Sequence, residues 1–386
     1  MKKCAIVLAA GEGTRMKVAT AKVLLPVLGK PMVQWVLSAA RGAGVEDCCL
    51  IVGKDWQQVE QCVGGGSEYA LQMERKGTGH AVMQADDFLR RHAGGHCVVL
   101  AGDCPLLSQK TLEEAFALHE REHNAVTVIS ARLSDPYGYG RVIRDGQGGL
   151  LRIVEEKDAN EEQRRVQEIN SSAYWFEVNA LLEALPLLDN RNAKGEYYLT
   201  DAIEILLRGG RRAGVFEALD SDEILGANTQ KQLLTLQKVA QAKVLERHLD
   251  NGVNFISRDV YIEPEVVIAP GATILPGCIL RGKTVVGADC VIGPNTLLED
   301  TVVEAGSTVN ASQCYESHIG PNNKIGPFSH LRTGTKTAEG CHLGAYVETK
   351  NADFAEGNTV SHLTYIGDAT VGKYCNFGCG TVTCNY

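Results

Sequence analysis

The sequence predicts an α/β protein in two parts, a doubly wound, Rossmann-like domain followed by a left-handed parallel β-helix of hexapeptide repeats. Three observations predict it. Apolar strand patterns alternate with helical patterns through the first 228 residues. A single long helical pattern then occupies residues 229–251. From Ile262 onward, an aliphatic residue recurs at every sixth position. We therefore expect domains at 1–228 and 252–386, joined by a helix at 229–251.

The first element is a buried strand at residues 4–10, because a continuous apolar run ends there at a glycine. Pro31 opens an amphipathic segment that reaches about Arg41, so we expect a helix with proline at its first position. Further strands are expected at 48–52 and 97–101, and further helices at 55–62, after Thr78 and from Ser108. Residues 138–176 are rich in β signals and glycine, and predict an inserted or lid sheet over the site.

Residues 229–250 carry an apolar stripe of helical spacing, with glutamine and lysine between its members. The pair Asn251-Gly252 ends this segment, as expected at a helix C-terminus.

The period of six then predicts a triangular coil, since it fits neither an α-helix nor a flat strand. The aliphatic positions are Ile262, Ile268, Ile274, Leu280, Val286, Ile292 and Leu298. A second, small register is formed by Ala272, Cys278, Thr284, Cys290 and Thr296. Each short strand would form one side of the coil and point one aliphatic residue inward. The last coil stops at Tyr386 without a polar cap, and we expect the chain to be a fragment of a longer protein.

Composition excludes several classes of protein. The net charge of −9 over 386 residues argues against general nucleic-acid binding. No apolar run is long enough to span a membrane, and the first strand leads into a charged loop rather than a cleavage site, so we expect a cytoplasmic protein. The thirteen cysteines lack metal-ligand spacing and are expected to be reduced thiols that pack as small apolar groups.

A glycine-rich loop follows the first strand in the segment Leu8–Met16, LAAGEGTRM. Backbone amides in such a loop can cradle phosphates. The segment is neither a dinucleotide fingerprint, because Met16 stands where that pattern needs glycine, nor a Walker loop, because no Gly-Lys-Ser/Thr follows. A tight strand-to-helix turn would also explain the glycines alone. Arg15 and Lys22 favour phosphate binding, since they place two cations just beyond the turn.

These residues, with Lys22-Val23-Leu24, resemble the signature of sugar-nucleotide pyrophosphorylases. More narrowly, the chain resembles bacterial bifunctional N-acetylglucosamine-1-phosphate uridyltransferase/glucosamine-1-phosphate acetyltransferases over its whole length. The further motifs are Gln72, GTGHA at 77–81, Gly102-Asp103, GYGR at 138–141, Glu155, EIN at 168–170, GEYYLTD at 195–201 and Asn228. The chain departs from the family at Ala21, Leu25, Arg75 and Ala101, and Arg75 stands where a second glutamine is usual.

The resemblance implies uridylyl transfer from UTP to N-acetylglucosamine-1-phosphate, with release of pyrophosphate, for peptidoglycan and lipopolysaccharide precursors. Arg15 and Lys22 would be catalytic, and Asp103 and Asn228 would hold Mg²⁺. The implied nucleotide- and sugar-binding residues are Leu8, Ala9, Ala10, Gly11, Gly13, Gln72, Gly77, Thr78, Gly102, Gly140, Glu155, Asn170 and Thr200. Taken singly, Asp103 could be a turn-capping residue before Pro105, and Asn228 an ordinary helix N-cap.

The β-helix carries a second set of motifs of the same family. The resemblance implies that His362 is the general base of acetyl transfer from acetyl-CoA to glucosamine-1-phosphate. The implied substrate-binding residues are Arg332, Lys350, Tyr365, Asn376, Asn385 and Tyr386. The family's motif continues past Tyr386, so this second activity is expected to be lost from the chain as given. A homotrimer is also expected, with no nucleic-acid or membrane partner.

Two other functions stay open. One is a different sugar-1-phosphate nucleotidyltransferase, which would use glucose- or mannose-1-phosphate or another nucleoside triphosphate. The other is a non-catalytic regulatory subunit of pyrophosphorylase-like fold. The second alternative would be favoured by loss of Arg15, Lys22 or Asp103, and all three are present.

Overall fold

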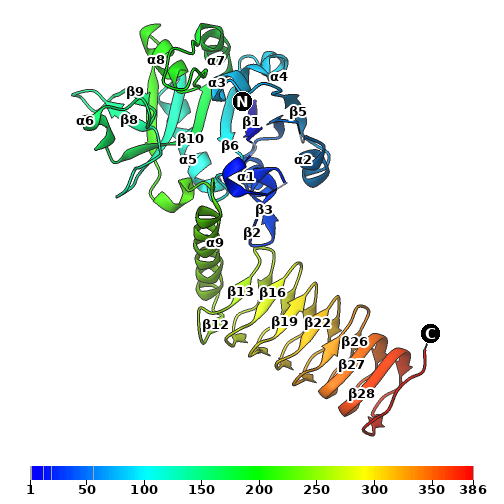
Figure 1. Cartoon of the computed structure of the whole chain (residues 1–386). Helices are drawn as coiled ribbons and strands as arrows, with labels where there is room; N and C mark the ends of the chain where they lie inside the picture. Colours follow the sequence, from blue (N-terminus) through cyan, green and yellow to red (C-terminus); the bar gives the residue numbers. More distant parts are fainter. Residues whose placement is uncertain (1, 12, 19, 55, 386) are drawn as a thin grey trace. The chain divides into compact units, whose positions relative to one another are not determined.

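The computed structural model describes residues 2–11, 13–18, 20–54 and 56–385. The chain divides into two compact units, Met1–Leu236 and Gln237–Tyr386, which are drawn together in Figure 1 and described separately below. The division falls within helix α9 (Gln230–Asp250), which is the long helix that the sequence predicts. Within the described residues, no helix combines the length and the apolar character that crossing a bilayer requires.

A mixed sheet forms the centre of the first unit, with strand order β11-β7-β10-β6-β1-β4-β5. The strands are β1 (Lys3–Ala9), β4 (Asp47–Val52), β5 (Glu68–Leu71), β6 (His96–Ala101), β7 (Val126–Arg132), β10 (Glu168–Glu177) and β11 (Ala213–Glu217). Neighbours pair in parallel, except that β10 runs antiparallel to both β6 and β7. After β1 the chain adds β4 and β5 on one side and then crosses to β6 on the other. The carboxyl ends of β1 and β6 therefore flank a topological switch point, where ligands of such sheets bind.

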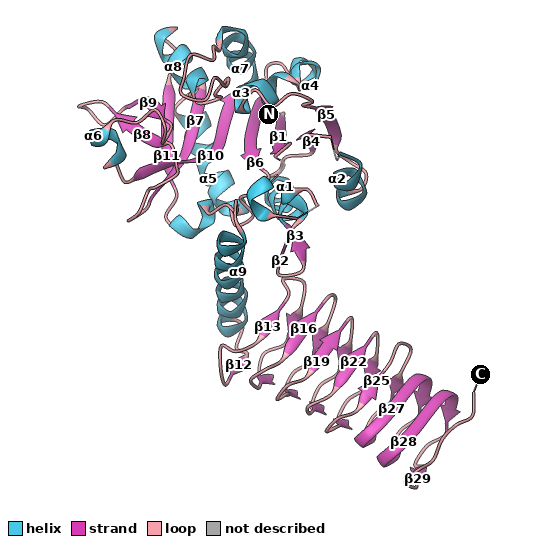
Figure 2. Ribbon diagram, in the orientation of Figure 1, coloured by secondary structure: helices cyan, strands magenta, loops and turns pink. Residues whose placement is uncertain are grey.

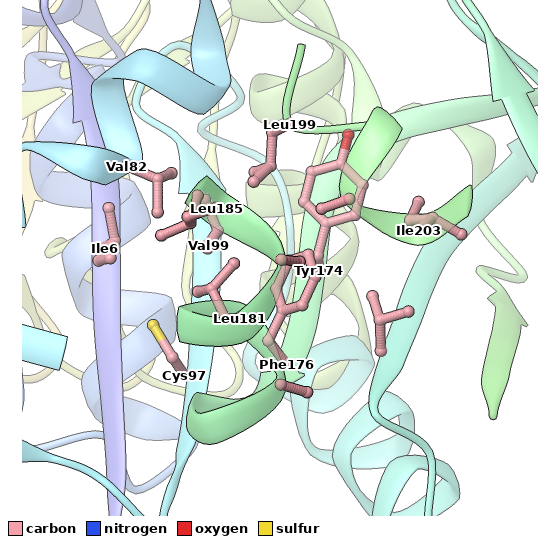
Figure 3. Packing of buried hydrophobic residues seen from close by; sticks show 14 of the residues in the cluster. Ile6, Val82, Cys97, Val99, Tyr174, Phe176, Leu181, Leu185, Leu199 and Ile203 are labelled. Carbon is pink, nitrogen blue, oxygen red and sulfur yellow. The ribbon is translucent and has the colours of Figure 1, made fainter. Parts of the chain in front are cut away.

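Helices cover both faces of this sheet (Figure 2). One core lies under α1 (Met32–Gly42), α2 (Trp56–Val63) and α5 (Gln109–Arg121). The other lies under α3 (Thr78–Met83), α4 (Asp86–Arg91), α7 (Val178–Ala184) and α8 (Asp201–Arg208). Figure 3 shows this second core, in which Val82, Leu181 and Ile203 pack against side chains of the strands. Pro31 lies just before α1, in β3 (Lys30–Pro31), and not at the first helical position as expected.

The expected lid at 138–176 is wrong in one respect. β10 is an interior strand of the main sheet, and only the hairpin of β8 (Arg141–Arg144) and β9 (Leu150–Val154) extends from it. The reason is burial on both faces. Tyr174 and Phe176 pack into one core and Trp175 into the other, so this strand needs helices on both sides. The short helix α6 (Glu161–Arg164) follows the hairpin. The hairpin with α6 is called the β8–β9 arm below.

The remaining short elements of the unit are η1 (Thr14–Met16), η2 (Lys22–Leu24), β2 (Pro26–Val27), η3 (Leu185–Leu187) and η4 (Ser221–Ile224). Of these, η1 and η2 follow the glycine-rich loop and carry its two cations.

A buried histidine makes the stability of the first unit depend on pH. His119 of α5 is fully buried, with Nδ1 2.9 Å from Thr127 Oγ1 and Nε2 3.1 Å from His96 Nδ1. Burial, and then the charge of His96, lower the pKa of His119 to about 3. The unfolded chain therefore binds more protons between pH 3 and about 6.5, so stability falls as the pH drops through this range.

We expect the free energy of unfolding to decrease by up to about 1.4 kcal/mol per pH unit for this one group below pH 6. Urea unfolding followed by tryptophan fluorescence between pH 4.5 and 7.5 measures it. The His119→Gln variant should have a shallower slope than wild type. The control is His123→Asn, because His123 is exposed and its φ of 52° suits asparagine. Equal slopes in wild type and His119→Gln would contradict the assignment.

The second unit is a parallel β-helix built from short strands. They are β12 (Asn254–Phe255), β13 (Tyr261–Ile262), β14 (Val267–Ile268), β15 (Thr273–Ile274), β16 (Ile279–Arg281), β17 (Val285–Val286), β18 (Val291–Ile292), β19 (Leu297–Glu299), β20 (Val302–Val303), β21 (Thr308–Val309), β22 (Gln313–Tyr315), β23 (His318–Ile319), β24 (Lys324–Ile325), β25 (His330–Leu331), β26 (Lys336–Thr337), β27 (His342–Phe354), β28 (Thr359–Val371) and β29 (Asn376–Phe377). Through β24, each strand pairs in parallel with the strand three places on, so three sides make one coil, and β25 and β26 both pair with the long strand β27. This confirms the left-handed hexapeptide β-helix, and the predicted aliphatic positions Ile262 to Leu298 are all buried.

The inward register continues beyond Leu298, but with some sides of five residues. Leu298 is followed by Val303, and Val309 by Cys314 and Ile319, all of them buried. Leu298 accordingly pairs with Cys314, sixteen positions on, whereas Ile262 pairs with Leu280, eighteen positions on. A pattern that requires an aliphatic residue at every sixth position therefore ends at Leu298, where the first five-residue side follows.

Candidate functional site

The glycine-rich loop leaves the sheet at the switch point. Leu8 pairs with Ala101 of β6, and Ala9 pairs with Val52 of β4, so three strands end side by side. The N–H of Gly102 donates to the carbonyl of Leu8 at 3.0 Å. Residues Leu8 to Gly11 and the segment Gly102-Asp103 are therefore neighbours. Glu12 and the side chain of Thr14 lie outside the part of the chain that the structure describes.

Lys22 lies against this loop. Gly13 has a φ of 61°, and a Cβ atom added to it would lie 2.8 Å from the Cβ of Lys22. Only glycine both adopts this conformation readily and leaves room for the lysine. Arg15 lies on η1, immediately after the loop, and is exposed. Two cations thus follow the loop, one held against it and one at the surface.

Three predicted residues converge at one point although they are distant in sequence. The ammonium of Lys22 forms an ion pair with Asp103 Oδ2 and donates to Asn228 Oδ1 at 3.0 Å. The side chains of Lys22 and Asp103 are only 12% and 19% exposed. The N–H of Ala227 donates to the carbonyl of Asp103 at 3.2 Å, which ties the two segments together. A carboxylate and an amide oxygen therefore face a single cation.

Asn228 taken singly could be the N-cap of α9, but the structure does not give it that position. Thr229 has this role, because its Oγ1 accepts from the N–H of Gln232 at 3.2 Å. The side chain of Asn228 is thereby free to bind Lys22. Asp103 is likewise engaged with Lys22 rather than acting only as a turn residue.

The loop at Gly77-Thr78 is fixed to a distant segment around Tyr197. Gly77 has a φ of 105°, and a Cβ there would overlap the carbonyl of Tyr197. Thr78 Oγ1 accepts from the N–H of Leu199 at 3.0 Å. Gln72, which is 5% exposed, donates from Nε2 to the carbonyl of Gly77 at 3.1 Å. Gln72, Gly77 and Thr78 therefore form one rigid wall.

Arg75 belongs to the same region. Its Nη2 lies 3.7 Å from where a Cβ on Gly53 would be, and that position is also 3.3 Å from the carbonyl oxygen of Ala10. This places the guanidinium at the carboxyl end of β4, beside the glycine-rich loop. The sequence shows that Arg75 stands where the family usually has glutamine. It does not show that the Arg75 side chain reaches the glycine-rich loop.

The implied sugar-binding residues Gly140, Glu155 and Asn170 are in contact. A Cβ on Gly140 would lie 3.4 Å from Glu155 Oε1 and 3.6 Å from the Cβ of Asn170. The N–H of Asn170 donates to the carbonyl of Gly140 at 2.9 Å, and its Nδ2 donates to Tyr174 Oη at 2.6 Å. A register shift in β10 directly after Asn170 marks a β-bulge, the kind of irregularity that re-aims side chains.

Acidic groups and Thr200 surround this contact. Burial raises the pKa of Glu155, while Lys194 opposes the shift and the Thr200 hydroxyl also lowers it. Burial, and then the charges of Asp189 and Glu204, together raise the pKa of Asp201 to about 6. Thr200 is buried at the start of α8. Tyr174 accepts from Asn170, and Asp201 follows Thr200 in sequence. Residue spacing in the sequence alone does not identify either as part of this group.

The second set lies on neighbouring coils of the β-helix. Arg332 Nη1 pairs with Glu348 Oε1 at 2.9 Å, and Glu348 lies beside Tyr365 in the β27–β28 pairing. Asn385 Nδ2 donates to Tyr365 Oη at 3.4 Å and also binds Asp368.

The other members of the second set spread along the same strands. Lys350 pairs with Gly367, and its charge helps Asn351 and Asn385 lower the pKa of Asp368. His362 is exposed beside Ala345. Asn376 lies in β29 and pairs with Thr359, which precedes His362 by three residues. Tyr386 lies outside the described residues. Glu348 and Asp368 were missed by sequence reasoning, although Glu348 stands in the motif VETK, two residues before Lys350.

Comparison with known proteins gives a family and a fold. Residues 4–223 match the nucleotidyl transferase family model, and residues 262–369 match the model of the GMPPB C-terminal domain. The chain is 42% identical to the bifunctional protein GlmU of Acetivibrio thermocellus over 383 residues, which cover 99% of the chain and 83% of that protein. It is 44% identical to the bifunctional protein GlmU of Lactobacillus delbrueckii subsp. bulgaricus, covering 100% of the chain and 84% of that protein.

A similarity to a solved structure supports the fold of the first unit. A Bacillus anthracis protein assigned as a glucose-1-phosphate thymidylyltransferase, solved with sucrose, aligns with a TM-score of 0.52 at 20% identity. The alignment covers 62% of this chain and 95% of that one. At this identity the similarity concerns the fold alone.

Proposed function

Because this chain belongs to the family of bifunctional GlmU proteins, we propose that its first unit transfers the uridylyl group of UTP to N-acetylglucosamine-1-phosphate. The products are UDP-N-acetylglucosamine and pyrophosphate. The observation that carries this proposal is the convergence of Lys22, Asp103 and Asn228 beside the glycine-rich loop. These residues come from three distant parts of the sequence and meet at the switch point of the sheet.

The chemistry needs positioning and charge neutralisation rather than a base. A phosphate oxygen of the sugar phosphate attacks the α-phosphorus of UTP, and the bond to pyrophosphate breaks. The nucleophile is already anionic near neutral pH, because the second pKa of a phosphate is about 6. Lys22 and Arg15 are the cations placed to neutralise the phosphates, and backbone amides of the loop orient them.

We propose that Asp103 and Asn228 hold Mg²⁺. The residues fit this ion in chemistry, since both offer hard oxygen donors, and their oxygens already converge on one cation, the ammonium of Lys22. Among the described residues, no cluster of three or more His, Cys, Asp or Glu side chains could hold a metal. A site with one carboxylate suits Mg²⁺, which usually completes its shell with water and substrate phosphates. When bound, the ion would neutralise charge on the triphosphate.

We assign recognition of the substrates to three groups of residues. Gln72, Gly77 and Thr78 form the proposed uracil wall, and Leu8, Ala9, Ala10, Gly11, Gly13 and Gly102 the proposed phosphate loop. Gly140, Glu155, Asn170 and Thr200 form the proposed sugar site. The fixed backbone contacts at Gly77 and Gly140 support this division.

For the second unit we propose a part in the family's acetyl transfer, which in the full-length protein runs from acetyl-CoA to the amine of glucosamine-1-phosphate. His362 is the proposed base, and Arg332, Lys350 and Tyr365 the proposed sugar-phosphate ligands, with Asn376 and Asn385 nearby. The linked contacts Arg332–Glu348 and Tyr365–Asn385 on neighbouring coils support a shared surface. Because UTP and acetyl-CoA are cytoplasmic metabolites, we propose that the protein acts in the cytoplasm.

Pyrophosphate release tests the first activity. The chain is incubated with Mg²⁺, each nucleoside triphosphate and each of N-acetylglucosamine-, glucosamine-, glucose- and mannose-1-phosphate. We expect the highest kcat/KM for UTP with N-acetylglucosamine-1-phosphate. Preference for another pair would support a different nucleotidyltransferase, and no release with any pair would support a non-catalytic subunit.

We propose that the protein forms a homotrimer through the β-helix. Phe328, Tyr346 and Leu363 are 57%, 60% and 60% exposed. The rings of Phe328 and Tyr346 stack with centroids 5.3 Å apart, and Tyr346 and Leu363 stand at corresponding positions between the paired residues Ala345–His362 and Val347–Thr364. These residues form an apolar ridge along one corner of the coils. An exposed apolar ridge of this kind usually marks an interface, and three copies can close around an axis.

Light scattering should accordingly give three times the 41.6 kDa subunit mass. Tyr346→Asn should shift the protein toward monomer, because it removes an aromatic ring from the ridge. Asparagine suits the positive φ of 58° at this position, so the coil itself should persist. A monomeric wild type at high concentration, or a variant with unchanged mass, would contradict this assignment of the interface.

A further inference from the structure

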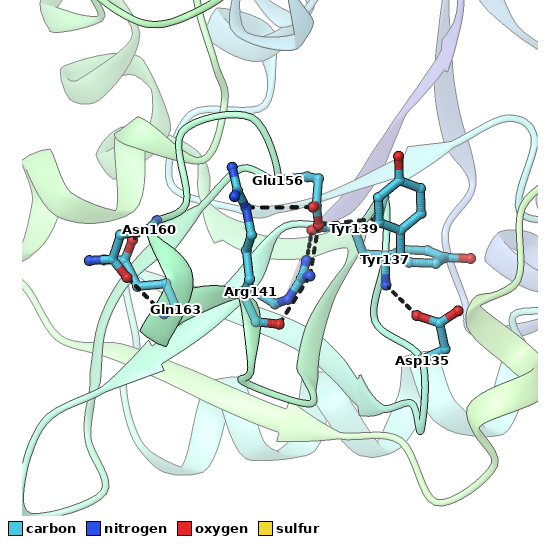
Figure 4. Close-up of polar contacts among 9 residues, drawn as sticks. Asp135, Tyr137, Tyr139, Arg141, Glu156, Asn160 and Gln163 are labelled. Atoms are coloured by element: carbon cyan, nitrogen blue, oxygen red, sulfur yellow. Dashed lines mark hydrogen bonds and ion pairs between the residues drawn. The ribbon is translucent and has the colours of Figure 1, made fainter.

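An ion pair between a buried arginine and a partly exposed glutamate lies in the β8–β9 arm, outside the residues assigned above. Arg141, at the start of β8, is 1% exposed, and its Nη2 lies 2.7 Å from Glu156 Oε2 (Figure 4). The guanidinium also donates to the carbonyl of Tyr139 and, at 3.4 Å, to that of Arg164. Glu156 Oε2 accepts in addition from the N–H of Gly138 at 3.2 Å. The pair therefore joins the turn before β8, the loop after β9 and the end of α6.

Each member of the pair is bonded through one peptide unit to a proposed sugar-binding residue. Gly140 precedes Arg141, and Glu155 precedes Glu156. The residues of the pair line an open groove of about 720 Å³ that also includes Tyr137, Lys157 and Arg164. Gly140 and Glu155 lie close to each other and to Asn170.

The pair thus links the two segments that carry the proposed sugar-binding residues Gly140 and Glu155. Arg141 pairs with Val154 across the hairpin and with Ile169 of β10. The Gly140 carbonyl is held by the N–H of Asn170, and a Cβ on Gly140 would be only 3.4 Å from Glu155 Oε1. A small separation of β8 from the loop after β9 would move Gly140 away from Glu155.

Such a pair adds little to stability, because removing Arg141 and most of Glu156 from water costs about as much as their attraction returns. The planar guanidinium, however, binds several acceptors in one fixed geometry. We propose that Arg141 and Glu156 are positioning residues that set the affinity and orientation of the acceptor sugar phosphate. This inference rests on the proposed uridylyl transfer, and deepens it by naming what holds the sugar site in shape.

The test separates the two substrates kinetically. In Glu156→Gln, which keeps the shape but removes the charge, we expect the KM for N-acetylglucosamine-1-phosphate to rise about tenfold to a hundredfold, as small misplacements do. The KM for UTP should stay within about twofold, because the pair lies away from the proposed uracil wall and phosphate loop. Arg141→Lys keeps the positive charge but loses the planar, multidentate guanidinium. We expect it to raise the KM for N-acetylglucosamine-1-phosphate by a smaller factor. It also serves if Glu156→Gln fails to fold.

The matched control is Arg144→Gln, on the same strand. Arg144 binds buried Glu168 at 2.6 and 2.7 Å, so the variant removes a comparable ion pair of β8. Neither Arg144 nor Glu168 is adjacent in sequence to Gly140 or Glu155. Both KM values should stay near wild type in this control. The inference is overturned if Glu156→Gln and Arg141→Lys leave both KM values unchanged, raise them equally, or behave like Arg144→Gln. An inactive wild type would instead refute the proposed function itself.

Discussion

Lys22→Ala is expected to lower kcat/KM for uridylyl transfer by about 10²–10³, the usual loss when one preorganised charge is removed from a transition state. The ammonium lies beside the phosphate loop, and its side chain is only 12% exposed, so water cannot replace its charge. Its removal also leaves Asp103 without its cation. Pyrophosphate release under saturating Mg²⁺ measures the effect.

Two further variants make this result specific. Lys22→Arg should recover only part of the activity, because a planar guanidinium cannot reproduce the point contacts that the ammonium makes with Asp103 and Asn228. Lys110→Ala, an exposed lysine of α5, should be indistinguishable from wild type. Near wild-type turnover in a folded Lys22→Ala protein would show that Lys22 is not part of the site.

Asp103→Asn should have the second largest effect, a rise in the Mg²⁺ concentration for half-maximal activity of about tenfold or more, with lower turnover. The substitution keeps the size of the side chain and removes the one charged oxygen donor of the proposed metal site. Asn228→Ala should shift the Mg²⁺ requirement less, since it removes a neutral ligand. Direct Mn²⁺ binding measured by electron paramagnetic resonance gives a second readout that does not depend on activity.

The control for this series is Asp86→Asn, which changes a surface carboxylate on α4 that pairs with Arg90. It should leave the Mg²⁺ titration unchanged. If the titration of Asp103→Asn also matched wild type, Asp103 would not be a metal ligand, and the contact with Lys22 would be structural.

Local pattern was enough to identify the two architectures. The alternation of strands and helices in the first unit, and the period of six in the second, both reflect backbone geometry repeated along the chain. The inward residues Ile262 to Leu298 are buried as that period predicts. The motifs around Lys22 and Asp103 could also be found in sequence, because each is short and lies at the end of one strand.

Contacts between distant segments were decided only by the tertiary structure. No local signal shows that Asn228 reaches Lys22 across 206 positions, nor that Thr229 takes over the cap and leaves Asn228 available. The same holds for β10, whose place inside the main sheet depends on cores on both of its faces.

The sequence by itself therefore determined what repeats or is contiguous, namely the fold of each unit and the identity of the loop residues. The tertiary structure decided which of these residues meet, and it added Arg141, Glu156, Glu348 and Asp368 as partners of the sites. The physical reason is that secondary structure follows from neighbouring residues along the chain. A site, in contrast, is made by packing that brings together side chains whose separation in sequence carries no information.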